Sequence, residues 1–137
     1  MTRPMTYALV AALSLLSAPV FAGDAAVGEK EFAKCKSCHG IVAADGTAIV
    51  KGGKTGPNLF GIVGRPVASA ADFKYGDSIL AVGASGAVWD EASLAAYMTD
   101  PGAWLRDKTG DAGAKSKMTF KLKAKAEDVA AYLATQK

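Results

Sequence analysis

Two cysteines and one histidine stand together as Cys35-Lys36-Ser37-Cys38-His39, and the 137-residue chain contains no other cysteine or histidine. C-x-x-C-H is the attachment pattern of c-type haem, in which the thiols bond to the porphyrin and the following imidazole binds the iron. A thioredoxin-like dithiol would need a βαβ pattern around the pair, and a zinc site would need further Cys or His ligands. The sequence shows neither feature. We therefore predict one covalently attached haem c, with His39 as an axial ligand of the iron.

Two methionines downstream of the motif are candidates for the second axial position. Met98 falls on the apolar face of a predicted helix at 91–99, which favours a packing role. Met118, Phe120 and Leu122 alternate with polar residues, and a period of two is typical of an extended segment with one apolar face. An edge strand would show the same alternation. We favour a segment laid along the haem, with the Met118 thioether bound to iron, because His/Met ligation suits a haem that carries electrons at a raised potential.

The first 22 residues have the pattern of a secretory signal peptide. Arg3 is their only charged residue, an apolar run covers 7–16, and the small residues Val20 and Ala22 precede the predicted cleavage site. A retained anchor helix is the alternative, but the apolar run is shorter than the about 20 residues that span a bilayer. Cleavage after Ala22 would release a 115-residue chain, 23–137, into the periplasm. Loss of Arg3 lowers the formal net charge from +3 to +2.

The remaining chain has the length and apolar content of a single globular domain, with half of all residues hydrophobic. Gly28 lies inside the first predicted helix, which suggests a close helix crossing there. The stretch 40–88 is rich in Gly, Pro, Asp and Ser and shows no sustained helical period, and we find no convincing β-sheet. We expect an all-α protein with long loops. Its predicted helices are 25–34 after Asp24, 91–99 after Asp90, a short helix from Pro101 to near Gly110, and 126–135, which lacks a capping residue.

The chain resembles the class I cytochromes c, most closely the bacterial cytochrome c2 group, over essentially all of 23–137. The motifs that carry the resemblance are Phe32 ahead of Cys35-Lys-Ser-Cys-His39, Gly56-Pro57-Asn58-Leu59 with Gly61, Gly64-Arg65, Phe73-Lys-Tyr75, Trp89, Leu94 to Tyr97, Lys117-Met118-Thr-Phe120 and Ala131-Tyr132-Leu133. The resemblance implies the cytochrome c fold, in which a few short helices and long loops wrap around one covalently bound haem. It also implies Met118 as the sixth iron ligand.

Further residue roles follow from the resemblance alone. The Pro57 carbonyl is expected to accept a hydrogen bond from Nδ1–H of His39, which would fix the orientation of the imidazole. Tyr97 is expected near the methionine sulfur and Phe120 near the haem edge. The expected donors to the haem propionates are Arg65, Tyr75 and Trp89, and the expected contacts between the terminal helices join Gly28 and Phe32 to Tyr132 and Leu133. The chain departs from shorter members by extra residues between Tyr75 and Trp89 and by an apparent insertion at 107–115.

Lysines cluster around the proposed methionine ligand. Between 115 and 125 the chain has five lysines and no acidic residue: Lys115, Lys117, Lys121, Lys123 and Lys125. We expect Lys34, Lys36 and Lys54 to join them around the haem edge. A solvated face is the ordinary explanation of such a run. Our hypothesis is a docking face for acidic redox partners. The low net charge and the export signal argue against nucleic-acid binding.

These observations favour a monomeric electron carrier of the periplasm with no stable membrane anchor and no catalytic residue. The resemblance implies a quinol:cytochrome c oxidoreductase of the bc1 type as electron donor, and a photosynthetic reaction centre or a terminal oxidase as acceptor. A haem enzyme or ligand sensor would need an open iron site, which a bound Met118 would block. A haem-free dithiol oxidoreductase is the third alternative.

Overall fold

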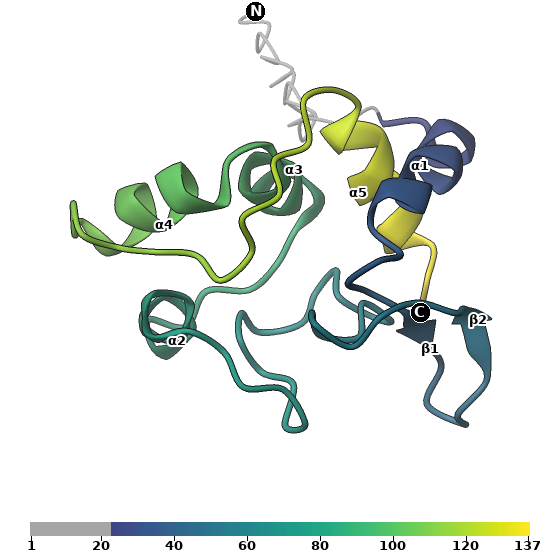
Figure 1. The fold of residues 1–137 in the computed structure, drawn as a ribbon, viewed down its shortest axis with the longest axis horizontal. Helices are drawn as coiled ribbons and strands as arrows, with labels where there is room; N and C mark the ends of the chain where they lie inside the picture. Colours follow the sequence, from purple (N-terminus) through teal and green to yellow (C-terminus); the bar gives the residue numbers. More distant parts are fainter. Residues whose placement is uncertain (1–22) are drawn as a thin grey trace, which may run out of the picture.

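The computed structural model describes residues 23–137, so the predicted signal segment 1–22 lies outside the described residues. In that part of the chain, five short helices and one small hairpin are joined by long loops (Figure 1). The elements in chain order are α1 (Ala25–Glu31), a 3₁₀ turn (Phe32–Lys34), β1 (Ile41–Val42), β2 (Ala48–Val50), α2 (Asp77–Ala84), α3 (Glu91–Thr99), α4 (Pro101–Thr109) and α5 (Ala126–Ala134). The chain thus has the all-α character expected from its sequence.

Helices α1 and α5 pack against each other at one side of the molecule (Figure 1). The crossing is close because Gly28 has no side chain: a Cβ at this position would overlap the backbone oxygen of Asp128. Phe32 and Tyr132 extend the contact, with ring centroids 5.6 Å apart. The crossing predicted at Gly28 is therefore present, and it joins the start of the described chain to its last helix.

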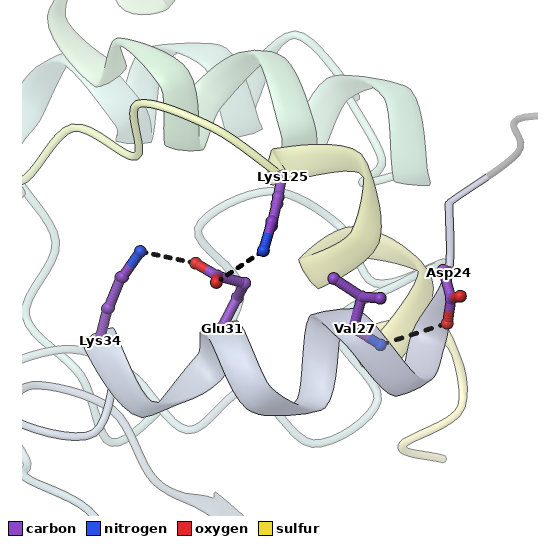
Figure 2. Close-up of polar contacts among 5 residues, drawn as sticks. All are labelled: Asp24, Val27, Glu31, Lys34 and Lys125. Carbon is purple, nitrogen blue, oxygen red and sulfur yellow. Dashed lines mark hydrogen bonds and ion pairs between the residues drawn. The ribbon is translucent and has the colours of Figure 1, made fainter.

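Polar contacts fix the two ends of α1. Asp24 caps the helix, since its carboxylate accepts hydrogen bonds from the backbone N–H groups of Ala26 and Val27. At the other end, Glu31 pairs with Lys34 at 2.6 Å and with Lys125 at 3.3 Å (Figure 2). Lys125 precedes α5 and has a left-handed backbone, with φ of 63°. Glu31 therefore ties the start of α5 to α1 at a helix end that has no side-chain cap.

Helices α3 and α4 begin and end where the sequence predicts. Asp90 and Ser93 form a reciprocal capping box at the start of α3. Asp100 ends α3 and caps α4, where Pro101 occupies the first turn, and Gly110 ends α4 in the left-handed conformation. These local signals suffice because each one satisfies backbone groups that a helix end leaves unpaired.

Three features of the fold differ from the prediction. The last turn of the first helix, at Phe32–Lys34, is 3₁₀ rather than α. The expectation of no β-sheet was wrong, because β1 and β2 pair antiparallel, with Ile41 opposite Val50. The stretch 40–88 also contains α2, which was predicted as irregular. Helix α2 lacks the usual sequence signals: its N-cap is Gly76, which has no side chain to offer, and Gly83 lies within it.

The hydrophobic core lies where the helices meet and includes Phe32, Leu105, Val129 and Leu133, each nearly or fully buried. The chain from Gly110 to Lys125 runs back from α4 to α5 without regular secondary structure (Figure 1). Within residues 23–137, no helix is long and apolar enough to cross a membrane.

Candidate functional site

A largely apolar cavity of about 330 Å³ lies among the helices and loops. This volume is within the range of roughly 300–1,000 Å³ that is usual for small-molecule and cofactor sites. The predicted site residues that line it are Cys35, Cys38, His39, Pro57, Tyr75, Trp89, Tyr97, Met118 and Phe120. Residues far apart in the sequence, with chemistry suited to one porphyrin, thus face one space.

His39 has one ring nitrogen engaged and the other free to bind a metal. Its Nδ1 lies 2.8 Å from the carbonyl oxygen of Pro57. Because a carbonyl can only accept, Nδ1 must carry the proton, and in the neutral ring the lone pair is then on Nε2. Burial lowers the pKa of His39, and the Pro57 hydrogen bond opposes this only in part. The geometry therefore presents a neutral, oriented imidazole, the form that ligates iron.

The two thiols are free and lie at the cavity, with Cys38 exposed and Cys35 half-buried. Burial, with a smaller effect of the neighbouring Cys38, raises the pKa of the Cys35 thiol to about 11. Because the thiolate is the reactive form in dithiol exchange, this raised pKa makes Cys35 a poor attacking thiol.

Both methionines line the cavity, but their settings differ. Met98 belongs to the hydrophobic core on α3 and is only 7% exposed, as its predicted packing role requires. Met118 is half-buried on the extended segment, and its backbone N–H donates to the hydroxyl of Ser116 at 3.1 Å. The alternative of an edge strand is wrong, because the described residues around Met118 form no strand and pair with none.

Tyr97 lies beside the same segment. Its hydroxyl is 3.3 Å from the hydroxyl of Ser116, so a chain of polar contacts joins Tyr97 to the backbone of Met118. Burial raises the pKa of Tyr97, although the contact with Ser116 lowers it somewhat. Trp89 and Trp104 back the tyrosine, with Trp89 at 5.3 Å and Trp104 at 5.4 Å between ring centroids. This aromatic packing holds Tyr97 rigidly at the cavity wall.

Two of the three predicted propionate donors lie at the cavity, and the third does not. Tyr75 and Trp89 line the cavity, and the Tyr75 hydroxyl accepts from the backbone N–H of Ala70 at 3.1 Å, which leaves its proton free to donate. Arg65 is not among the lining residues. Its guanidinium donates to the carbonyls of Asn58 at 3.0 Å and Phe60 at 3.2 Å, while its buried Nε has no partner among the described residues. An unpaired buried donor of this kind is costly unless an acceptor reaches it.

These observations test whether the residues fit a haem. The donor set comprises two thiols, a neutral imidazole and a thioether around one apolar cavity. The buried Nε of Arg65, a residue outside the cavity lining, is an unpaired donor suited to a carboxylate. Both features match what a covalently attached, dicarboxylic porphyrin requires. The residues fit.

The lysines predicted to surround the site are not equivalent. Lys115 and Lys117 line the cavity, and Lys117 donates to the carbonyl of Lys74 at 3.1 Å. Although no acid occurs between 115 and 125 in the sequence, the fold brings acids to two of the lysines there: Lys121 pairs with Asp100 at 2.8 Å, and Lys125 pairs with Glu31. Part of the positive charge is therefore neutralised within the chain.

Two residues with positioning contacts were not assigned roles from the sequence. Asn58 bonds to both backbone groups of Val42 and to the N–H of Phe60, which fixes the loop that carries Pro57. Ser116 bridges Tyr97 and Met118. The Gly-Pro-Asn-Leu motif drew attention to Asn58, whereas nothing in the sequence distinguished Ser116 from other serines.

Comparison with known proteins gives a consistent result. No family model matches the chain. The chain is 61% identical to cytochrome c2 of Rhodobacter capsulatus over 131 residues, which cover 96% of this chain and 95% of that protein. It is 61% identical to cytochrome c-550 of Paracoccus versutus, covering 93% of this chain and 85% of the relative. The crystal structure of the R. capsulatus protein matches with a TM-score of 0.82 and covers 82% of this chain and 97% of that structure.

Proposed function

This chain belongs to the class I c-type cytochromes, in the cytochrome c2 group, and from that membership we propose that it is a periplasmic carrier of single electrons between membrane redox complexes. Its cofactor is one covalently attached haem c. When bound, the haem supplies a one-electron iron couple. The observation that carries the proposal is that Cys35, Cys38, His39 and Met118 line one cavity.

The side chains at the cavity would hold the group as follows. Cys35 and Cys38 provide the two thioethers, and His39 and Met118 provide the axial ligands. Pro57 fixes the His39 tautomer through the 2.8 Å hydrogen bond. Arg65, Tyr75 and Trp89 donate to the propionates, and Tyr97 supports the methionine side. With both axial positions filled by protein, no residue of the chain acts on a substrate, so we assign no catalytic residue.

We further propose a route of export to the periplasm and a docking surface for redox partners. Residues 1–22 are a signal peptide removed after Ala22, and 23–137 form a single monomeric domain. The docking face comprises Lys115, Lys117, Lys121 and Lys123, with Lys36 and Lys54 at its border. Complementary charge speeds encounter and orients a complex that must dissociate quickly. By family, a bc1-type complex donates the electron, and a photosynthetic reaction centre or a terminal oxidase accepts it.

The two methionines allow a matched test of the ligand assignment. Met118→Leu and Met98→Leu each keep side-chain volume while removing one thioether. In the matured ferric protein, the weak long-wavelength band of methionine–iron ligation should be lost in Met118→Leu and retained in Met98→Leu. The converse result would move the assignment to Met98. Loss of Soret absorption in correctly matured wild-type protein would refute the haem proposal as a whole.

The docking face has a separate test. Association of the reduced protein with isolated membranes containing its acceptor should slow as ionic strength rises, because salt screens exposed charges. Lys117→Gln should weaken this salt dependence. An association rate indifferent to salt would refute the electrostatic docking face and leave the ligand assignment intact.

A further inference from the structure

Three glycines bring the loop at 52–56 directly onto the haem-attachment segment. A Cβ at Gly52 would overlap the carbonyl oxygen of His39, and a Cβ at Gly53 would overlap that of Ser37. A Cβ at Gly56 would overlap the imidazole ring of His39 itself. The main chain of the loop therefore occupies the space where side chains would otherwise separate the two segments.

Backbone hydrogen bonds accompany this close approach. The N–H of Gly53 donates to the carbonyl of Lys36, and the N–H of Gly56 donates to the carbonyl of Cys38, each at 2.8 Å. The attachment segment is itself turned, with the N–H groups of Cys38 and His39 both donating to the carbonyl of Cys35. The loop thus donates hydrogen bonds to two carbonyls of the attachment segment that the turn itself leaves unpaired, and buried backbone groups need such partners.

The requirement for glycine at these positions is one of space and not of backbone conformation. None of Gly52, Gly53 and Gly56 has the positive φ that favours glycine, in contrast to Gly61 and Gly64. An alanine could adopt their backbone angles without strain. Any effect of alanine here must therefore come from pushing the loop away from the attachment segment.

We propose that Gly52, Gly53 and Gly56 are positioning residues that clamp the attachment segment, fixing the orientation of the His39 ring and the spacing of the two cysteine sulfurs. The proposal rests on the proposed haem attachment at Cys35 and Cys38 and ligation by His39. Pro57 orients the ring through its Nδ1 edge, whereas Gly56 backs the ring by contact. If the clamp exists, the orientation of the His39 ring depends on Gly56, which has no side chain and makes no hydrogen bond to the ring.

The test compares Gly56→Ala and Gly52→Ala with Gly113→Ala. Gly113 also lacks a positive φ, and a Cβ there would meet only the flexible side chain of Asp111. The main measurement is the proton NMR spectrum of the ferric, haem-loaded protein, in which the haem methyl shifts report the orientation of the axial imidazole. Gly56→Ala should alter the pattern of methyl shifts, and Gly52→Ala should lower the haem-loaded yield, whereas Gly113→Ala should match wild type in both.

Hydrogen exchange of the wild-type protein tests the same clamp without a substitution. The amides of Gly53 and Gly56 should exchange at least roughly tenfold more slowly than those of Lys54 and Thr55 in the same loop, which make no backbone hydrogen bond among the described residues. Equal exchange rates would overturn the proposal, as would unchanged methyl shifts and yield in both variants. These outcomes presuppose haem in the wild-type protein, whereas colourless wild-type protein would refute the proposed function instead.

Discussion

The carboxylate of Glu31 joins lysines from opposite ends of the described chain. Its two oxygens meet Lys34 at 2.6 Å and Lys125 at 3.3 Å, and only 16% of its side chain is exposed. The hydrogen bond from Lys34, and after it the bond from Lys125, lowers the pKa of Glu31 below its ordinary value of 4.5. A carboxylate with a lowered pKa stabilises the fold above its unfolded-state pKa and loses that contribution as the pH falls through its folded-state pKa.

Glu31→Gln should therefore reduce the acid sensitivity of the fold. We expect the variant to be less stable than wild type at neutral pH, with the difference shrinking as the pH falls below about 4.5. Chemical denaturation of the variant and the wild type, at neutral pH and again below about pH 4.5, measures this difference in the free energy of unfolding. Asp107→Asn is the control, because the carboxylate of Asp107 is 77% exposed and its nearest lysine is 3.8 Å away. A pH-independent loss in Glu31→Gln would show that the carboxylate acts without its charge.

At the scale of residues, the sequence predicted which residues form the site better than it predicted which residues hold them in place. Cys35, Cys38 and His39 were recognisable because their spacing is dictated by one chemical task. The support given by Ser116 to Tyr97 and Met118 could not be predicted, because it depends on where two distant segments meet. For the same reason, the pairing of Lys125 with Glu31 across 94 positions left no trace in the local pattern of charges.

The crossing of α1 and α5 is the element contact most sensitive to one atom. Because a Cβ at Gly28 would overlap the Asp128 backbone oxygen, Gly28→Ala must push the helices apart. We expect a loss of about 1–3 kcal/mol in the free energy of unfolding, as is usual for overpacking. Urea denaturation measures it.

Gly102→Ala is the matched control for this crossing, since Gly102 is also helical, on α4. A Cβ at Gly102 would face only the side chains of Arg106 and Asp100, at 3.3 and 3.7 Å. Alanine should be neutral there or stabilise by up to about 1 kcal/mol through helix propensity. Equal losses in the two variants would contradict a steric role of Gly28.

The capping box of α3 predicts a second element-scale effect. Asp90→Ala removes the acceptor for the backbone N–H of Ser93 at 2.6 Å and should cost about 1 kcal/mol in the free energy of unfolding. Asp77→Ala is the comparison, since Asp77 also starts a helix but makes no side-chain cap bond there. Its effect should stay within about 0.5 kcal/mol. Thermal denaturation of both variants measures the two losses of stability. A larger loss in Asp77→Ala than in Asp90→Ala would contradict the prediction.

At the scale of elements, prediction succeeded where helix signals are local and failed where tertiary contacts replace them. Asp24, Asp90 and Pro101 each act within one turn of their own helix, so their helices were predicted with nearly correct ends. Helix α2 has a glycine N-cap, and its Gly83 is needed because a Cβ there would overlap the Val67 carbonyl. The hairpin β1–β2 has only two or three residues per strand, too few for a periodic pattern.

At the scale of the whole molecule, the cavity takes the place of a larger side-chain core. The core residues Phe32, Leu105, Val129 and Leu133 lie on its walls, so segments from both ends of the described chain meet there. A haem bound there would bury the apolar walls of the cavity, and burial of apolar surface is the main favourable term in folding.

Loss of haem attachment should therefore unfold the chain rather than merely inactivate it. In Cys35→Ser/Cys38→Ser, which cannot form thioethers, we expect loss of most helical far-UV circular dichroism and of cooperative thermal unfolding. Met118→Leu should keep both, because it removes an iron ligand but leaves the covalent attachment and side-chain volume in place. The Soret band of each sample reports whether haem is present. A haem-free double variant with native helicity and a cooperative transition would show that the side-chain core is sufficient without the haem.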